Sequence, residues 1–328
     1  MAQLMGYFNK HEKDDLVILV ATSGDTGGAV ASGFYETSGI KVVLLYPSGK
    51  VSTLQEKQLT TLGKNIAAIE IEGTFDDCQA LVKKAFLDKE LNANIRLSSA
   101  NSINIARLIP QSFYYFEAFK QIENKANDLV FCVPSGNFGN LTAGLLAQKM
   151  GLPVNRFIAA TNINDIVPLY LKEGIYSPKP SVPTISNAMD VGDPSNFKRM
   201  LDLFLSERKD EGKGSTWNNM RKFIAGFAFS DKSTKEGIKE VFDKYNYIID
   251  PHGAVGYLAL KEFQRKHNTT GIILETAHPS KFINVVENEI GQHVSIPKRL
   301  AVLADKRKES IRMLPNFNYF KSFLLQSY

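Results

Sequence analysis

Short apolar runs alternate along the chain with longer segments that are apolar on one face only. Residues 16–21 are continuously apolar, which is typical of a strand buried on both faces of a sheet. Strands of this kind that alternate with helices predict a parallel sheet covered by helices on both sides. In the first part of the chain the pattern predicts strands at 16–21, 41–46, 66–71 and 95–98, with helices at 27–37, 53–62 and 75–87.

A long helical pattern at 105–122 leads into a second block of the same kind. This block holds predicted strands at 129–133, 156–160 and 271–275, and helices at 141–150, 197–205 and 232–245. The charged run 207–213 predicts a solvent-exposed turn. The expected fold class is therefore α/β with two open parallel-sheet domains, a smaller one at 16–109 and a larger one at 110–328.

Composition excludes several classes of protein. The chain has 328 residues with 39 Lys+Arg and 34 Asp+Glu, a net charge of +5 without a basic patch, so a nucleic-acid partner is not expected. Its two cysteines, Cys78 and Cys132, fit no disulfide or zinc pattern, which favours a reducing cytoplasm. No apolar run approaches the length of a membrane span. We expect a cytoplasmic protein with a small-molecule partner, and the oligomeric state stays open.

Function is expected in loops that follow strands, because ligands of open α/β sheets bind at the carboxyl ends of strands. The loop 22–28 follows the first predicted strand and contains Ser23, Asp25, Thr26 and Gly27. Its glycines let backbone N–H groups approach a ligand, and the next helix adds its positive dipole end, which suits a carboxylate or phosphate. The alternative is that Asp25 or Thr26 only caps the helix. The glycine spacing does not match a dinucleotide fingerprint.

A second loop, 134–140, has the strand–glycine loop–helix arrangement of a phosphate cradle built from backbone N–H groups. No P-loop lysine follows Gly139, so a phosphate ester other than a nucleotide fits better. The alternative is a glycine-rich turn without a ligand.

A third loop, 98–104, is a run of short polar side chains ahead of a helix that carries Arg107. It predicts either a polar substrate site, with Arg107 supplying charge to a phosphate, or an ordinary capping turn. Thr276 follows the last predicted strand and suits a heterocyclic nitrogen. For His252 and His278 a proton-transfer role and a structural role both remain open.

Seven stretches together resemble the threonine synthase family. Its members are pyridoxal-phosphate enzymes of the tryptophan synthase β-like fold, which is also called fold type II. The stretches occur in the family's order over nearly the whole chain: ATSGDTG (21–27), LQEK (54–57), SANSIN (99–104), VPSGNFG (133–139), AATN (159–162), SNAMDV (186–191) and TAHP (276–279).

The resemblance implies conversion of O-phosphohomoserine and water to threonine and phosphate, the last step of threonine biosynthesis. In that reaction pyridoxal phosphate acts as the electron sink for carbanions at Cα and then Cβ, phosphate leaves from Cγ, and water adds at Cβ.

The resemblance also implies roles for residues of all three loops. The implied partners of the cofactor are Gly136, Asn137, Phe138, Gly139 and Asn140 for its phosphate, Thr276 for the pyridine nitrogen and Asp25 for the ring oxygen. The implied partners of the substrate are Ser23, Thr26, Gly27, Asn101, Ser102, Asn104 and Arg107.

One departure concerns the Schiff-base lysine, which the family carries in a Phe-Lys-Asp segment upstream of the first glycine loop. The present sequence has no such segment, and its opening resembles the helix that follows that lysine. The expectation is an N-terminally truncated threonine synthase, with residues 1–15 as a remnant helix, an incomplete larger domain and no activity of its own. Alternatives are Lys281 or Lys50 as substitutes, a serine/threonine dehydratase-like lyase, or a non-catalytic protein that binds pyridoxal phosphate or another phosphate ligand.

Overall fold

The chain folds into two compact units. The computed structural model describes residues 1–101, 104–123, 127–205 and 213–328. The first unit joins Met1–Asn104 to Ile296–Tyr328, and the second comprises Ile105–Ser295.

The first unit is built on a five-stranded sheet in the order β4-β1-β2-β3-β9, in which every neighbouring pair is parallel. The strands are β1 (Leu16–Ala21), β2 (Ile40–Pro47), β3 (Ile66–Ile71), β4 (Arg96–Ser99) and β9 (Ile311–Met313). The four strands expected from the apolar runs are confirmed. β9 was not expected, because three residues are too few to form a pattern.

Helices cover both faces of this sheet. Successive residues of a strand point to opposite faces, so Val17 and Leu19 enter one core and Ile18 and Val20 enter another. The helices are α1 (Ala2–Asn9), α2 (Asp25–Phe34), α3 (Thr53–Thr60), α4 (Phe75–Leu87), α5 (Lys89–Asn94), α14 (Lys298–Ala304) and α15 (Phe317–Ser327). Capping boxes, built by Ser52 with Gln55 and by Thr74 with Asp77, fix the starts of α3 and α4.

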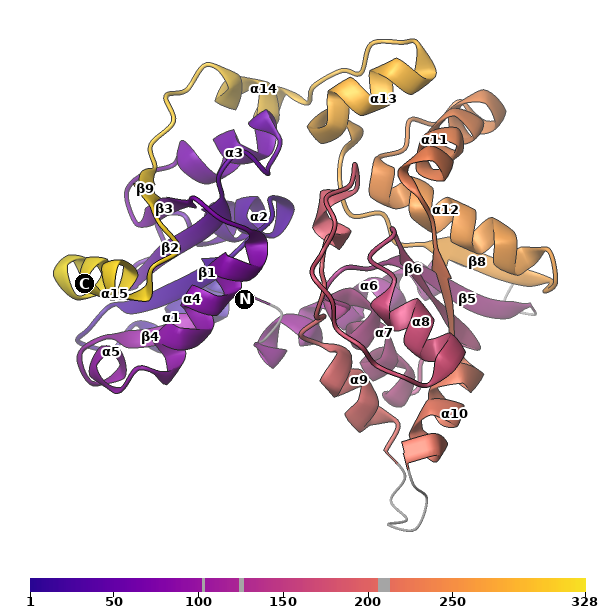
Figure 1. Ribbon diagram of the computed structural model, residues 1–328, viewed down its shortest axis with the longest axis horizontal. Coiled ribbons are helices and arrows are strands. Elements are labelled where there is room, and N and C mark those ends of the chain that lie inside the picture. The colour runs from indigo at the N-terminus through magenta and orange to yellow at the C-terminus, as the bar shows by residue number, and fades with distance from the viewer. Residues whose placement is uncertain (102–103, 124–126, 206–212) are drawn as a thin grey trace. The chain divides into compact units, whose positions relative to one another are not determined.

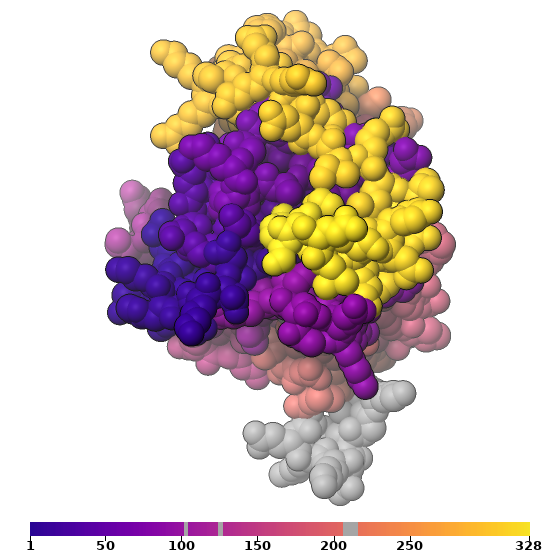
Figure 2. All heavy atoms as spheres, turned by 90° about the vertical axis from the view of Figure 1, so that its left-hand side faces the viewer, coloured from indigo at the N-terminus to yellow at the C-terminus, as the bar shows by residue number. Residues whose placement is uncertain are grey.

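The C-terminal segment belongs to the first unit, whereas the sequence pattern placed it in the larger domain at 110–328. β9 pairs with β3, and Phe320 and Leu324 of α15 are fully buried in the core that β1 shares with α4. Figure 2 shows these C-terminal atoms in yellow against the indigo and purple atoms of the N-terminal elements. Because β9 and β3 are far apart in the sequence, their pairing leaves no local signal in it.

The second unit holds a four-stranded parallel sheet in the order β7-β6-β5-β8. The strands are β5 (Asp128–Pro134), β6 (Arg156–Thr161), β7 (Ile224–Ala228) and β8 (Thr269–Ile273). β7 was not expected. The strand predicted at 271–275 ends at Ile273, although the N–H of Leu274 still donates to the carbonyl of Cys132.

Helices surround this second sheet (Figure 1). They are the 3-10 turn η1 (Ile105–Arg107), α6 (Leu108–Lys120), α7 (Gly139–Lys149), α8 (Ile166–Glu173), α9 (Phe197–Leu203), α10 (Lys213–Phe223), α11 (Asp231–Tyr245), α12 (Pro251–Gln264) and α13 (Ile283–Ile290), with short 3-10 turns at η2 (Asn187–Met189) and η3 (Pro279–Phe282). The charged turn predicted at 207–213 lies outside the described residues except for Lys213, where α10 begins. No helix in the described part of the chain is long and apolar enough to cross a membrane.

Candidate active site

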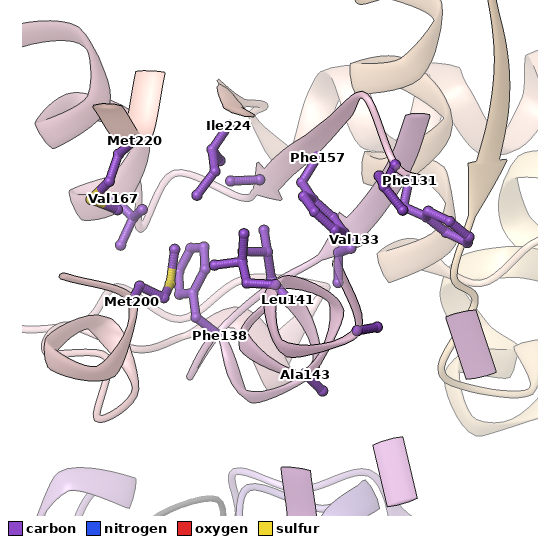
Figure 3. Packing of buried hydrophobic residues seen from close by; sticks show 14 of the residues in the cluster. Phe131, Val133, Phe138, Leu141, Ala143, Phe157, Val167, Met200, Met220 and Ile224 are labelled. Carbon is purple, nitrogen blue, oxygen red and sulfur yellow. The ribbon is translucent and has the colours of Figure 1, made fainter. Parts of the chain in front are cut away.

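The glycine loop that follows β5 leads directly into the N-terminus of α7. Phe138 is the N-cap of α7 and has left-handed backbone angles, φ 59° and ψ 17°. Its ring is buried beside Leu141 and Met200 in the core of the second unit (Figure 3). The side chain of Phe138 therefore anchors the loop, and only its backbone can face a ligand.

Backbone N–H groups collect at this helix start. No residue within the described ranges accepts a hydrogen bond from the N–H groups of residues 136–140, and no side chain caps α7. A run of unpaired N–H groups at a helix N-terminus is an anion-binding arrangement, because the helix dipole adds partial positive charge there. The donor set fits a phosphate group. We call residues 136–140 the cradle.

Ser135 is excluded from this set, because its N–H donates to the carbonyl of Ala160 at 2.8 Å. Asn137 and Asn140 of the loop accept hydrogen bonds from residues outside it. The Asn137 side-chain oxygen accepts from the N–H of Ser195 at 3.2 Å, and the Asn137 carbonyl accepts from Nδ2 of Asn196 at 3.0 Å. Tyr115 donates its hydroxyl to the Asn140 carbonyl at 2.7 Å. The side chains thus fix the backbone of the cradle.

A segment from a distant part of the chain packs on Gly136. A Cβ atom at this position would lie 2.2 Å from the carbonyl oxygen of Ala188 and 3.0 Å from Cα of Met189. Both neighbouring atoms belong to backbone, so neither can rotate away. Only glycine permits this close approach. We call residues 186–190 the wall of the cradle.

Buried polar groups hold the wall at the end of β6. Asn162, which is fully buried, donates to Asp190 at 2.9 Å and to Thr184 at 2.7 Å. Thr184 donates to Asp190 through both its N–H, at 2.9 Å, and its hydroxyl, at 2.7 Å. Burial raises the pKa of Asp190 to about 6, and the hydrogen bonds from Thr184 and Asn162 oppose that rise.

Thr276 lies at the end of the strand next to the cradle. β8 pairs with β5 in parallel, with Ile273 opposite Cys132, so Thr276 and the cradle leave adjacent strands at the same edge of the sheet. The side chain of Thr276 is exposed, and its hydroxyl has no hydrogen-bond partner among the described residues. A neutral hydroxyl here is available to a ligand on the cradle.

The two histidines singled out from the sequence differ in their surroundings. His278 caps η3 by accepting at Nδ1 from the N–H of Ser280 at 3.2 Å, which favours the structural role. His252 is 2% exposed and lies 2.7 Å from the carboxylate of Asp250, which is fully buried.

In the first unit, the glycine loop after β1 is organised by Thr22. The Thr22 hydroxyl oxygen accepts from the N–H of Gly24 at 3.0 Å and from the N–H of Gly27 at 2.8 Å. Neither Asp25 nor Thr26 caps α2: its N-cap is Gly24, without a side-chain cap bond. The simple capping alternative for these two residues is therefore wrong. Ser23 and Thr26 are partly exposed at the helix start, where the dipole favours an anion.

The side chain of Gln55 packs against this loop and bonds to it. It is fully buried at the start of α3, and its Nε2 donates to the Asp25 carboxylate at 3.2 Å. A Cβ at Gly24 would lie 2.7 Å from Cδ of Gln55, and Gly24 has φ 140°. Close packing and backbone conformation therefore both require glycine at position 24.

In the third loop, the side chains of Asn101 and Asn104 are bonded to backbone groups of the protein. The Asn101 side chain accepts from the N–H of Ala21 at 2.9 Å and donates to the carbonyl of Ala21 at 2.6 Å, which ties it to the end of β1. Asn104 donates its side-chain amide to the carbonyl of Ser99 at 2.9 Å. Ser102 lies outside the described residues.

Arg107 lies near the start of the second unit and is the N-cap of α6, rather than a residue one turn inside a helix. The predicted helix 105–122 opens as the 3-10 turn η1. Burial lowers the pKa of the Arg107 guanidinium, an effect that Tyr114 opposes, and the group keeps its charge at neutral pH.

Several residues that shape the loops of each unit and the wall of the cradle were not predicted from the sequence: Thr22, Gln55, Asn162, Asp190, Asn196 and Asp250. Only Asp250 carried a usable local signal, because an Asp followed by Pro is typical of an N-cap with Pro at the first helical position. The others act through contacts distant in sequence or through unusual loop geometry.

Comparison with known proteins gives two family matches. A family described as pyridoxal-phosphate dependent enzyme matches residues 1–274, and one described as the C-terminal part of threonine synthase matches residues 253–323. Threonine synthase of *Buchnera aphidicola* from *Acyrthosiphon pisum* is 48% identical over 327 residues, which cover 99% of this chain and 73% of the relative. Threonine synthase of *Escherichia coli* K12 is 50% identical over 291 residues, 88% of this chain and 65% of the relative.

Solved structures agree with the sequence matches. The *Escherichia coli* threonine synthase structure has a TM-score of 0.90 and 44% identity, covering 100% of this chain and 74% of that one. A threonine synthase from *Brucella melitensis* with bound pyridoxal phosphate has a TM-score of 0.86 and 33% identity, covering 99% of this chain and 73% of that one. The mixed α/β fold with parallel sheets is thus that of fold type II, as expected, and the chain belongs to the threonine synthase family of pyridoxal-phosphate-dependent enzymes.

Proposed function

We propose that this chain carries the cofactor-phosphate and pyridine-nitrogen sites of a threonine synthase that converts O-phosphohomoserine and water to threonine and phosphate. The observation that carries the proposal is the cradle: unpaired N–H groups at the start of α7, beside the exposed hydroxyl of Thr276. Bound pyridoxal phosphate supplies the electron sink that this chemistry needs. The residues of the chain bind its phosphate and orient its ring.

The spacing of the two elements supports this assignment. Neighbouring strands of a sheet lie about 5 Å apart, and the cradle after β5 and Thr276 after β8 follow two such strands at the same edge of the sheet. Thr276 would meet the ring nitrogen as a neutral group, which favours an unprotonated ring. Asp25, fixed by Gln55, is our assignment for the ring oxygen.

Substrate binding is assigned to the remaining small polar groups. The hydroxyls of Ser23 and Thr26 and the backbone at Gly27 lie at the start of α2, where a carboxylate or phosphate of the substrate is favoured. Arg107, with Asn104, is proposed to bind the phosphate of the substrate, because a partly desolvated guanidinium pairs strongly with an anion. The Asn101 side chain is proposed to act through Ala21 by fixing the loop that follows it.

We further propose that no lysine of this chain forms the covalent bond to the cofactor, and that the 328-residue chain alone has no threonine synthase activity. Lys50 is exposed at the turn after β2, and Lys281 lies in η3, where its N–H donates to the carbonyl of His278. A catalytic lysine must reach the cofactor carbonyl and exchange protons there. The family carries it in a Phe-Lys-Asp segment, and neither Gly49-Lys50-Val51 nor Ser280-Lys281-Phe282 has that sequence.

The phosphate assignment is tested by comparing pyridoxal phosphate with pyridoxal, which lacks the phosphate, in equilibrium dialysis. We expect the chain to bind pyridoxal phosphate at least about tenfold more tightly, as charge-assisted hydrogen bonds to a phosphate require. Gly136→Ala should remove this preference, because its Cβ would force the Ala188 backbone away. Gly33→Ala is the matched control, since a Cβ at Gly33 meets no atom within 4 Å. Equal binding of both compounds by the unmodified chain would refute the cradle.

The lysine assignment is tested by adding one equivalent of pyridoxal phosphate, reducing with borohydride and mapping the modified peptides by mass spectrometry. We expect no single lysine to be labelled in preference to the others. Stoichiometric labelling of Lys281 or Lys50, or phosphate release from O-phosphohomoserine by the purified chain, would contradict the proposal.

A further inference from the structure

We propose that His252, oriented by Asp250, is a positioning residue that holds the wall of the cradle against Gly136 and so maintains the affinity for the cofactor phosphate. This inference rests on the phosphate role of the cradle proposed above. Its evidence is a chain of contacts within the second unit that is independent of the unpaired N–H groups.

The chain of contacts begins at the N-terminus of α12. Asp250 is the N-cap of this helix, and its carboxylate accepts from the N–H of His252 at 2.8 Å and from the N–H of Gly253 at 3.2 Å. The same carboxylate lies 2.7 Å from Nδ1 of His252. Both residues are buried, so the imidazole is fixed in place by the start of the helix.

The other ring nitrogen reaches the wall. The N–H of Ala188 donates to Nε2 of His252 at 3.2 Å. The carbonyl oxygen of the same residue, Ala188, is the atom that packs on Gly136, 2.2 Å from where a Cβ would be. One residue of the wall is thus held by His252 through its N–H and packs on the cradle through its C=O.

These contacts assign the tautomer of the ring. Because Nε2 accepts a hydrogen bond, it carries no proton, and Nδ1 carries the proton that faces Asp250. A neutral imidazole with both nitrogens engaged and 2% exposure is not placed to exchange protons with a substrate. The ring of Phe282 packs edge-on against it with centroids 5.0 Å apart, which further restricts its orientation. His252 therefore acts through Ala188, and a positioning role fits where a catalytic one does not.

Two substitutions separate the contacts of His252. An Asn amide reaches about as far as Nδ1, so His252→Asn keeps the bond to Asp250 and loses the bond to Ala188. A Gln amide reaches about as far as Nε2, so His252→Gln keeps an acceptor for Ala188 and loses the bond to Asp250. The two variants have the same chemistry and differ by one methylene.

The readout is the ratio of dissociation constants for pyridoxal and pyridoxal phosphate in equilibrium dialysis of the 328-residue chain. We expect His252→Asn to weaken binding of pyridoxal phosphate about tenfold with pyridoxal unaffected, and His252→Gln to restore most of the loss, because one buried hydrogen bond separates them. Equal ratios in His252→Asn and the unmodified chain would overturn the inference. Gly136→Ala separates the two claims: if it abolishes phosphate preference and His252→Asn does not, only the positioning role fails.

If His252→Asn does not fold, hydrogen exchange of the unmodified chain decides. The inference predicts that the Ala188 amide exchanges at least about a hundredfold more slowly than an unprotected amide, since its partner is a buried and fixed ring. Exchange of Ala188 at the rate of an unprotected amide would show that His252 does not hold the wall.

Discussion

The side-chain amide of Gln55 donates to the carboxylate of Asp25, with Nε2 and Oδ1 3.2 Å apart. The other end of the same side chain accepts from the N–H of Ser52 at 3.0 Å, within the capping box of α3. One fully buried glutamine therefore links the start of α3 to the start of α2. The position of Asp25, assigned above to the cofactor ring, depends on a residue outside its own loop.

Gln55→Glu replaces the amide donor with a second carboxylate oxygen facing Asp25. We expect the free energy of unfolding to fall by about 2 to 3 kcal/mol at pH 7, because a buried donor is lost and two like charges meet. The loss should shrink near pH 4, where one carboxyl binds a proton. Urea unfolding followed by circular dichroism at both pH values measures this.

Gln121→Glu is the matched control. Gln121 is exposed and its amide donates to Glu117 at 3.4 Å, so the substitution also places two carboxylates together, but in water. It should cost about 0.5 kcal/mol or less. A loss for Gln55→Glu no larger than that of the control would show that the Gln55–Asp25 contact is dispensable.

Asn101→Ala should leave both backbone groups of Ala21 without partners at the buried end of β1. Each unpaired buried group costs about 1 to 3 kcal/mol, so we expect the two together to lower the free energy of unfolding by about 2 to 6 kcal/mol. Asn94→Ala, which removes an exposed side-chain bond to the carbonyl of Glu90, should change stability by less than about 0.5 kcal/mol. If the two variants unfold at the same urea concentration, Asn101 is free for another role.

The strands that could be predicted are those with continuous apolar runs. β1 and β3 have the predicted bounds, because a central parallel strand buries mostly apolar residues; Glu70 of β3 is the one buried polar residue in these two strands. β7 contains Gly226 and is fully buried only at Ile224, and β9 has two exposed residues out of three. β9 has no apolar run that distinguishes it from a loop. β7 lies in the apolar run 223–229, which Gly226 interrupts and which the sequence pattern did not single out as a strand. Their places in the sheets come from packing that involves distant residues.

The candidate functional loops likewise combine features that are local in sequence with contacts that are not. Positions of the glycine loops were predictable, because the order strand, glycines and helix start is local in sequence. The contacts that fix those loops could not be predicted, because they join residues distant in sequence. Gln55 lies 30 residues from Asp25, and Asn101 lies 80 residues from Ala21. Asn101, which the sequence suggested as a ligand for a substrate, is bonded to the backbone of Ala21 at the end of β1.

The C-terminal segment is attached to the first sheet by an ion-pair cluster. Lys308 lies 2.7 Å from Glu70 of β3 and 2.6 Å from Glu56 of α3. Glu70 is 6% exposed and also accepts from the Ser48 hydroxyl at 2.6 Å. Burial would raise the pKa of Glu70, but the bonds from Lys308 and Ser48 prevail and lower it. Glu70 is thus charged in the folded protein and depends on Lys308.

Lys308→Met should cost about 2 to 4 kcal/mol, because removing one partner leaves an uncompensated buried charge. Adding Glu70→Gln to this variant should recover part of the loss, with a coupling of about 1 to 3 kcal/mol in a double-mutant cycle. Lys306→Met, at an exposed position two residues away, should change stability by less than about 0.5 kcal/mol. Additive effects of the Lys308 and Glu70 substitutions would show that the pair does not hold the segment.

The raised pKa of Asp190 predicts how the stability of the second unit depends on pH. With a folded pKa of about 6 and an ordinary value of 3.8, the folded protein binds more protons than the unfolded chain between these values. The free energy of unfolding therefore falls as the pH rises from about 4 to 6, by about 2 to 3 kcal/mol, and this contribution is constant above about pH 7. The single tryptophan, Trp217, lies in α10 of this unit and reports its unfolding in urea.

Asp190→Asn is the control, because it removes the titrating group while keeping a side chain of the same shape. The difference in unfolding free energy between this variant and the unmodified chain isolates Asp190 from the other carboxylates. A difference that does not change between pH 4 and pH 7 would mean that Asp190 is already charged at pH 4, and that the bonds from Asn162 and Thr184 outweigh its burial.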